Sequence, residues 1–130
     1  MRKKALLVND SRFESLILRD LLNKLDYDVE IADEFDAIYE VEQFRPDIII
    51  VNYIMQEITG NELIKKIKIG QPTVKCVLSS SNDFQLSDFY DEPIDGILRT
   101  PASIIGLKDV LFQLSASVYK NSPYDDFDED

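Results

Sequence analysis

Ile48-Ile49-Ile50-Val51 is the most apolar run of the 130-residue chain. β-branched residues favour extended strands, and a strand without polar alternation is typical of a parallel sheet covered on both faces. Pro46 comes just before the run and disfavours helix in the residue that precedes it, so we expect the previous helix to end there. The run therefore predicts a central strand buried on both sides.

On both sides of this strand, short apolar runs alternate with longer amphipathic segments, as in repeated strand–helix units. The other predicted strands are Ala5–Val8, Val29–Ala32, Val74–Leu78 and Ile94–Arg99. The five predicted helices are one capped by Ser11 and running to Leu25, one capped by Asp33 or Asp36, then Gly60–Gly70, the short Asp83–Tyr90, and Ser103–Tyr119. This alternation predicts an α/β fold, a flavodoxin-like (βα)5 three-layer sandwich whose parallel strands have the order 2-1-3-4-5.

The first predicted helix has the clearest start signal. Ser11-x-x-Glu14 is a capping box, in which each side chain bonds a free backbone N–H of the first turn. Phe13, Leu16 and Ile17 begin a series of apolar residues at helical spacing that continues to Leu25. We therefore expect these residues to form the face of the helix that packs on the sheet.

Composition excludes several functions. The 25 acidic and 14 basic residues give a net charge of −11, which repels phosphate backbones and argues against nucleic-acid binding by this domain alone. The chain has no histidine, so imidazole catalysis and histidine-bound metals are excluded. Its one cysteine, Cys76, lies in an apolar run and is expected to be a buried thiol in a reducing, cytoplasmic environment. No segment is apolar enough for a membrane span.

The chain divides into one domain, 1–120, and an acidic tail, 121–130. The tail carries five acidic residues and no base, so we expect it to be disordered, although Tyr124 and Phe127 leave a docking segment as an alternative. In sheets of the expected order, function lies where the first and third strands end. This rule predicts a functional crevice at Asn9, Asp10 and Asn52.

At these positions the chain resembles the receiver domains of two-component response regulators, of the chemotaxis-regulator type, over about residues 3–119. Leu7-Val8-Asn9-Asp10-Ser11 is similar to the segment that ends in the family's acidic pair, and Pro46–Asn52 to the strand that ends in the phosphoacceptor. Gly60 matches the glycine that opens the third helix, Ser79 the switch hydroxyl, and Thr100-Pro101 the family's Lys-Pro pair. The resemblance implies a role in bacterial phosphorelay signalling.

The sequence departs from the family pattern at the residues that carry its chemistry. An aspartate is required where this chain has Asn52, whose amide oxygen is a poor nucleophile. Thr100 replaces the lysine that would stabilise phosphoryl charge, and Asn9 replaces one of two metal-binding acids. Tight Mg²⁺ binding is therefore not expected, although weak binding at Asp10 stays open. Ile97 stands at the family's aromatic switch position, so coupling to Ser79 is expected to be lost. We therefore expect no cofactor and no enzymatic activity.

These residues also have plainer interpretations. Asn9, Asp10 and Asn52 can be loop polar groups satisfied by backbone and water, and Ser79 a helix cap. Thr100-Pro101 is expected to keep a cis peptide bond for its turn.

The resemblance also predicts a contact surface, because receivers commonly bind partners through their fourth helix, fifth strand and fifth helix. The candidate contact residues there are Phe84, Phe89, Tyr90, Ile97 and Arg99, although the aromatic ones can simply cover the sheet. We expect a pseudo-receiver that acts without phosphorylation, by binding a signalling protein or by homodimerising. Two alternatives stay open: a phospho-receiver that uses Ser79, Asp10 or Asp47, and a small-molecule-binding flavodoxin-like domain. The small-molecule alternative is disfavoured because this chain has no glycine-rich phosphate loop after its first predicted strand.

Overall fold

The computed structural model describes the backbone of residues 2–120 and the side chains of residues 2–115. Its five strands are β1 (Lys3–Val8), β2 (Tyr27–Ala32), β3 (Ile48–Asn52), β4 (Lys75–Ser80) and β5 (Gly96–Arg99). Its α-helices are α1 (Arg12–Lys24), α2 (Ala37–Phe44), α3 (Gly60–Gly70) and α4 (Ile104–Lys120). All neighbouring strands are parallel, and their order is β2-β1-β3-β4-β5, which confirms the predicted fold. The predicted tail, 121–130, lies outside the described residues.

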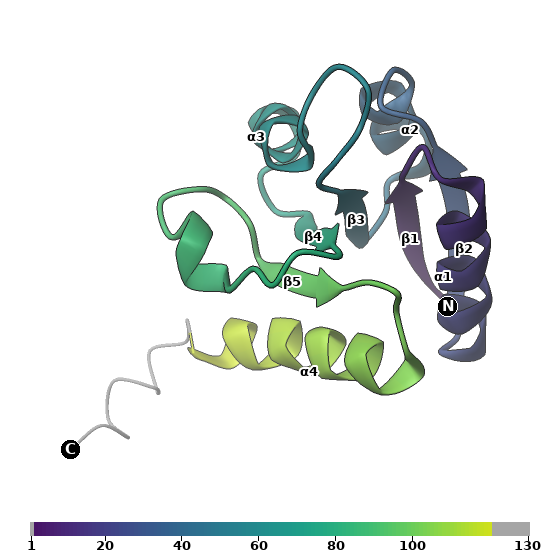
Figure 1. Ribbon diagram of the computed structural model, residues 1–130, viewed down its shortest axis with the longest axis vertical. Helices are drawn as coiled ribbons and strands as arrows, with labels where there is room; N and C mark the ends of the chain where they lie inside the picture. The colour runs from purple at the N-terminus through teal and green to yellow at the C-terminus, as the bar shows by residue number, and fades with distance from the viewer. Residues whose placement is uncertain (1, 121–130) are drawn as a thin grey trace.

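The sheet lies between two helical layers, α2 and α3 on one face and α1 and α4 on the other (Figure 1). Alternate residues of β3 face opposite layers. Ile49 and Val51 pack with α2 and α3, whereas Ile48 and Ile50 pack with α1 and α4. All four side chains are buried, which confirms the central strand predicted from the apolar run.

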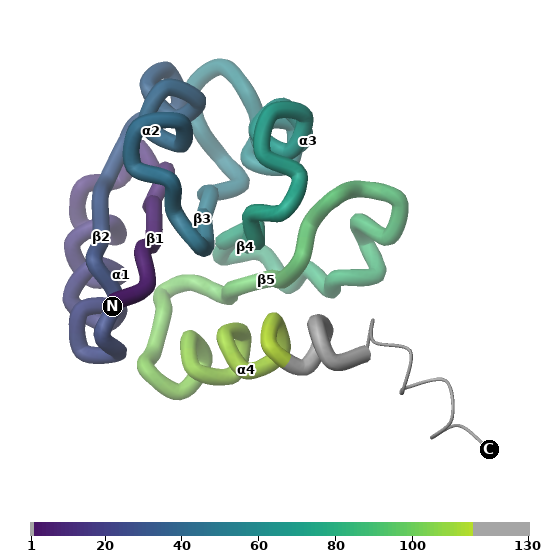
Figure 2. Tube along the Cα trace, turned by 180° about the vertical axis from the view of Figure 1, so that it is seen from behind, coloured from purple at the N-terminus to yellow at the C-terminus, as the bar shows by residue number. Residues whose placement is uncertain are grey.

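One predicted helix is wrong. Residues 83–90 form only a short 3₁₀ helix, Leu86–Phe89, in the long segment between β4 and β5 (Figure 2). Phe89 is its only buried residue, too little apolar surface to hold several turns against the sheet. Asp88 also closes the turn locally, because its carboxylate accepts a hydrogen bond from the N–H of Gln85 at 2.8 Å.

The start of α1 contains one of the two hydrogen bonds of the predicted capping box. The hydroxyl of Ser11 accepts from the N–H of Glu14 at 3.3 Å, as expected. The N–H of Ser11 instead donates to Oδ1 of Asn9 at 2.8 Å. The apolar face is also displaced, since Phe13 is 74% exposed while Leu18 and Leu22 are buried. No helix among the described residues has the length and apolar character of a membrane span.

Cys76 lies in β4 and is fully buried, as expected. Burial, together with the nearby carboxylate of Asp95, raises the pKa of its thiol from the ordinary 9.0 to about 12, although the cation of Lys68 acts to lower it. The unfolded chain therefore loses this proton at lower pH than the folded chain does. Above pH ~9 the unfolded state binds fewer protons, so stability falls as pH rises.

We therefore expect the free energy of unfolding to fall above pH ~9, by up to about 1.4 kcal/mol per pH unit from this one group. Denaturant titrations at several pH values measure the slope. Tyr27, whose pKa is also raised by burial and then by Asp47, contributes at higher pH, so the comparison is with Cys76→Ala. An equal slope in the variant would contradict the assignment to Cys76.

Candidate functional site

The carboxyl ends of four strands bring the predicted pocket residues together. Asn9 follows β1, Asn52 ends β3, and strand register pairs Asn52 with Ser79 of β4. Thr100 follows β5, and its N–H donates to the carbonyl of Ser80 at 2.9 Å. Asn9, Ser79 and Thr100 are buried, Asn52 is half-buried, and Asp10 is exposed. The structure therefore places Asn9, Asn52, Ser79 and Thr100 at one edge of the sheet.

Asn9 is held by both ends of its amide. Its Oδ1 accepts from the N–H of Ser11 at 2.8 Å, and its Nδ2 donates to Oε1 of Glu14 at 3.1 Å. A carboxylate can only accept hydrogen bonds. An aspartate at position 9 would therefore lose the bond to Glu14 and place two negative charges side by side.

Asn52 is bound in the same manner. Its Nδ2 donates to the carbonyl oxygen of Ile54 at 2.7 Å, within the loop that joins β3 to α3. The carbonyl oxygen is an acceptor only, so this contact requires the amide N–H. Both asparagines of the crevice thus serve as hydrogen-bond donors, a role that a carboxylate cannot fill.

These residues do not fit a tightly held Mg²⁺ ion. Mg²⁺ prefers carboxylate oxygens in near-octahedral geometry, and Asp10 is the one carboxylate among the predicted pocket residues. Oδ1 of Asn9 is already bonded to a backbone N–H. Within the described part of the chain, no cluster of three or more acidic, cysteine or histidine side chains lies close enough to hold a metal.

Ser79 and Thr100 complete the crevice. The hydroxyl of Ser79 is buried and has no hydrogen-bond partner among the described residues. Ser79 is not a helix cap, because it lies inside β4. The Thr100-Pro101 peptide bond is cis, as predicted.

The three residues considered as alternative phosphoryl acceptors differ in exposure and in their distance from the crevice. Ser79 is 1% exposed, so a phosphodonor does not reach its hydroxyl in this structure. Asp47 lies at the opposite end of the sheet, where its carboxylate accepts from the N–H of Lys4 at 2.8 Å. Of the three, Asp10 alone is both exposed and in the crevice.

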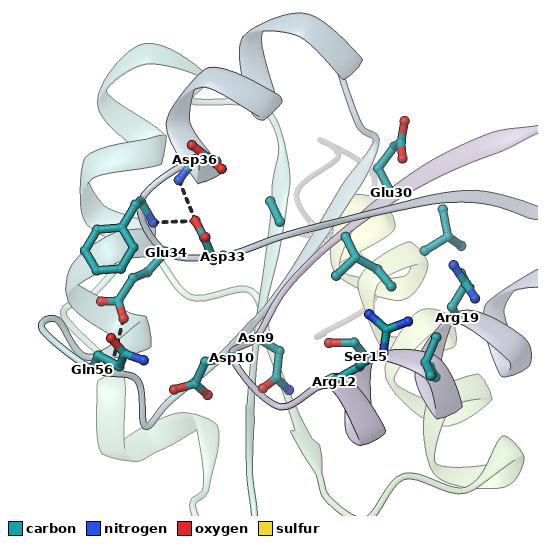
Figure 3. Close-up of a pocket in the computed structure, with 15 residues that line it drawn as sticks. Asn9, Asp10, Arg12, Ser15, Arg19, Glu30, Asp33, Glu34, Asp36 and Gln56 are labelled. Atoms are coloured by element: carbon teal, nitrogen blue, oxygen red, sulfur yellow. Dashed lines mark hydrogen bonds between the residues drawn. The ribbon is translucent and has the colours of Figure 1, made fainter.

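A cleft of about 700 Å³ opens next to the crevice, between α1, β2 and the loop that leads to α2 (Figure 3). Arg12 and Arg19 of α1 line one wall, and Asp33 and Asp36 lie across from them (Figure 3). Five acidic residues and two arginines line the cleft, so its lining has a net negative charge.

Glu34 is a residue that sequence reasoning missed. It lies in the loop between β2 and α2, is buried, and points toward the loop after β3 (Figure 3). Its carboxylate accepts three consecutive backbone N–H groups, those of Gln56 at 2.7 Å and of Glu57 and Ile58 at 3.1 Å. In the sequence, Glu34 is one acid among several and gives no signal of this role.

We expect Glu34→Gln to lower the free energy of unfolding by about 2 kcal/mol, because the amide NH₂ turns toward backbone N–H donors. Thermal and urea melts measure the change. Glu30→Gln, an exposed acid on β2, is the matched control and should change stability by less than about 0.5 kcal/mol. Equal effects in the two variants would show that Glu34 does not hold the loop.

Tyr53 connects the crevice to the predicted contact surface. It follows Asn52 directly, and its N–H donates to the carbonyl of Ser79 at 2.8 Å. Its ring meets Phe84 edge-on with centroids 5.0 Å apart, and Phe84 meets Phe89 at 5.2 Å. The sequence shows an aromatic residue next to Asn52, but it does not show that the ring of Tyr53 packs against Phe84, because that contact depends on the tertiary fold.

The five predicted contact residues separate in the structure. Phe89, the last residue of the 3₁₀ helix, is buried, which corrects its assignment to the contact surface. Tyr90 is 86% exposed, whereas Phe84 and Ile97 are half-buried. Arg99 is exposed, and its guanidinium bonds the carbonyl of Ser81 and the carboxylate of Asp83. Leu86, which the sequence reasoning did not select, is exposed close to Tyr90 in the chain.

A flavodoxin-like sheet of this order, with polar residues at the ends of β1, β3 and β4, is an architecture that receiver domains share with flavodoxins. Residues 5–111 match the family model of the response regulator receiver domain, and the chain belongs to that family. It is therefore a receiver domain of two-component signalling.

Individual relatives agree with this assignment. The chemotaxis protein CheY of Halobacterium salinarum is 33% identical over 108 residues, which cover 78% of this chain and 87% of that protein. CheY of Thermotoga maritima is 30% identical over 83 residues, 62% of this chain and 69% of that protein. The structure of Vibrio cholerae CheY4 shares the fold, with a TM-score of 0.80 at 22% identity over 88% of this chain and 99% of that one.

Proposed function

We propose that this receiver domain is a pseudo-receiver, a signalling domain of bacterial two-component or phosphorelay machinery that acts without being phosphorylated. One observation carries the proposal. Asn9 and Asn52 both use their amide N–H groups in local bonds, to Glu14 and to the carbonyl of Ile54. The crevice is therefore stabilised by the residues that an acyl-phosphate site would have to replace.

The chemistry of position 52 supports the same conclusion. An acyl phosphate forms when a carboxylate oxygen attacks phosphorus and the donor's leaving group departs. An amide oxygen carries no negative charge, and its lone pairs are delocalised into the amide bond. Thr100 supplies no cation to offset the charge of the transferred group, since its side chain is a neutral hydroxyl.

Output then depends on contacts with other proteins. The candidate surface comprises the 3₁₀ helix, β5 and α4, with a second copy or another signalling protein as the partner. Leu86 and Tyr90 are exposed there, and α4 exposes Ile105 and Phe112, seven residues apart on one side of the helix. A contiguous patch of exposed apolar side chains is typical of an interface, and these four side chains are the ones that would form such a patch on this surface. We further propose a cytoplasmic location, which the reduced, buried Cys76 supports.

Light scattering over a range of concentrations tests this surface. If it forms a homodimer, the wild type gains mass with concentration, and Leu86→Asp/Tyr90→Asp stays monomeric. The control variant, Tyr39→Asp/Ile69→Asp, changes two exposed residues of the opposite helical layer and should behave as wild type. Addition of acetyl phosphate with Mg²⁺ should leave the molar mass measured by light scattering unchanged. A dimer that forms only after acetyl phosphate would contradict the proposal.

A further inference from the structure

A second surface lies on the opposite layer, between α2 and α3. A groove of about 340 Å³ has buried Leu63 in its lining, together with Phe35, Ile38 and Ile58. Glu57 and Lys66 also line it. The groove shares no residue with the 3₁₀ helix, β5 and α4, so a partner bound there is independent of any partner on that other surface.

Phe35 is the most unusual residue of this groove. It lies in a loop between acidic residues, yet its side chain is 61% exposed, and neighbouring Ile38 is 45% exposed. The backbone of Phe35 is fixed in this position, because Oδ1 of Asp33 accepts its N–H at 3.0 Å and that of Asp36 at 2.9 Å (Figure 3). The loop thus holds a large apolar ring toward solvent instead of burying it.

The two sides of the groove are also held at a fixed separation. Phe35 belongs to the loop before α2, and Ile58 to the loop before α3. Glu34 joins these loops through its three bonds to the backbone N–H groups of residues 56–58. A groove whose walls are fixed before binding loses less conformational entropy when a partner enters.

Charge around the groove selects the partner. Glu34, Glu57 and Lys66 are the charged residues that line the groove, and the two segments that form it, residues 33–42 and 54–66, carry seven acids and two lysines, a net charge of −5. A second copy would bring two such surfaces together and is disfavoured by repulsion. A groove between two helices, with an apolar lining and an acidic surround, fits an amphipathic helix whose polar face is basic.

We propose that the α2–α3 groove binds a basic amphipathic helix of a partner protein, with Phe35 and Ile38 as its main apolar contacts. The acidic residues around the groove attract the basic face of that helix, and the joined loops keep the groove open. Exposed aromatic and aliphatic side chains that meet a partner in such a groove commonly provide most of the binding energy.

The test uses the full chain and a designed probe, an amphipathic peptide of leucine and lysine about 18 residues long, which is long enough to be helical when bound. A peptide in which glutamate replaces lysine is the charge control. ¹⁵N-labelled protein is titrated with each peptide, and amide shifts are mapped. We expect the lysine peptide to shift residues of the segments 33–42 and 54–66, and the glutamate peptide to shift none.

Two double variants separate the groove from general attraction between opposite charges. Phe35→Ser/Ile38→Ser should weaken binding of the lysine peptide at least tenfold, about 1.4 kcal/mol. Phe13→Ser/Ile69→Ser removes two exposed apolar side chains that do not line the groove and should bind as wild type does. Circular dichroism confirms that each variant is folded.

Three results would overturn the proposal. Equal weakening in both double variants, or shifts spread over the whole surface, would show non-specific attraction of a cation to an acidic protein. A concentration-dependent dimer that Phe35→Ser/Ile38→Ser abolishes would assign the groove to a second copy. Binding of the glutamate peptide with the same affinity would show that the groove does not require a basic partner.

Discussion

Asn52→Asp alone is expected to accept a phosphoryl group from acetyl phosphate at least about 100-fold more slowly than the triple variant Asn9→Asp/Asn52→Asp/Thr100→Lys. The single variant restores the nucleophile, but Thr100 still supplies no cation. Removing one group that stabilises developing negative charge costs about 10²–10³ in rate. Phosphate incorporation over time, followed by intact-mass spectrometry with Mg²⁺ present, measures both rates.

Asn52→Asp should also destabilise the domain. In the wild type, the side-chain amide of Asn52 donates a hydrogen bond to the carbonyl oxygen of Ile54 at 2.7 Å. In the variant, a carboxylate oxygen would face that carbonyl oxygen instead, unless the loop moves. We expect a loss of about 1–3 kcal/mol in the free energy of unfolding, the usual cost of an unsatisfied polar group. Phosphorylation of the single variant as fast as the triple variant would show that the missing lysine and acid are not limiting.

Gly60→Ala is expected to have the largest effect on stability among the predicted variants. A Cβ atom on Gly60 would overlap the backbone carbonyl oxygen of Asn52 and would lie 2.8 Å from Cδ1 of Leu78. The first contact is with backbone, so it is relieved only if α3 moves away from β3. We expect a loss of about 3 kcal/mol or more, at the upper end for overpacked interiors.

Gly70→Ala is the matched control on the same helix. No atom lies within 4 Å of the position that its Cβ would occupy. Alanine also restricts the unfolded chain more than glycine does, so the control should keep or raise stability by about 0.4–1 kcal/mol. Urea denaturation compares the two variants. Equal stability of Gly60→Ala and wild type would mean that α3 does not approach β3 as closely as described.

The fold could be predicted from the sequence because burial and periodicity agree in its main elements. The run 48–51 is apolar at every position, so no partly exposed strand accommodates it. The segment 83–90 has a helical pattern but forms only a 3₁₀ helix, since its local capping and its single buried aromatic residue do not support more turns. Phe13 matches the helical spacing, but its side chain faces solvent.

The candidate site was predictable in position but not in detail. Strand ends place Asn9, Asn52 and Ser79 together because parallel strands end at one edge of the sheet. The sequence does not say which way an amide points, so the bonds to Glu14 and Ile54 required the structure. Glu34 was missed because the three backbone N–H groups that it binds lie more than twenty residues away in the chain.

Intact-mass spectrometry of the wild-type chain after incubation with acetyl phosphate and Mg²⁺ tests the central claim most directly. Because the side chain at position 52 is an amide, we expect the mass to stay unchanged, while the triple variant gains one phosphoryl group of about 80 Da. A stoichiometric gain of that mass on the folded wild type, removable by hydroxylamine, would show that an acyl phosphate forms in this domain and would contradict its assignment as a pseudo-receiver.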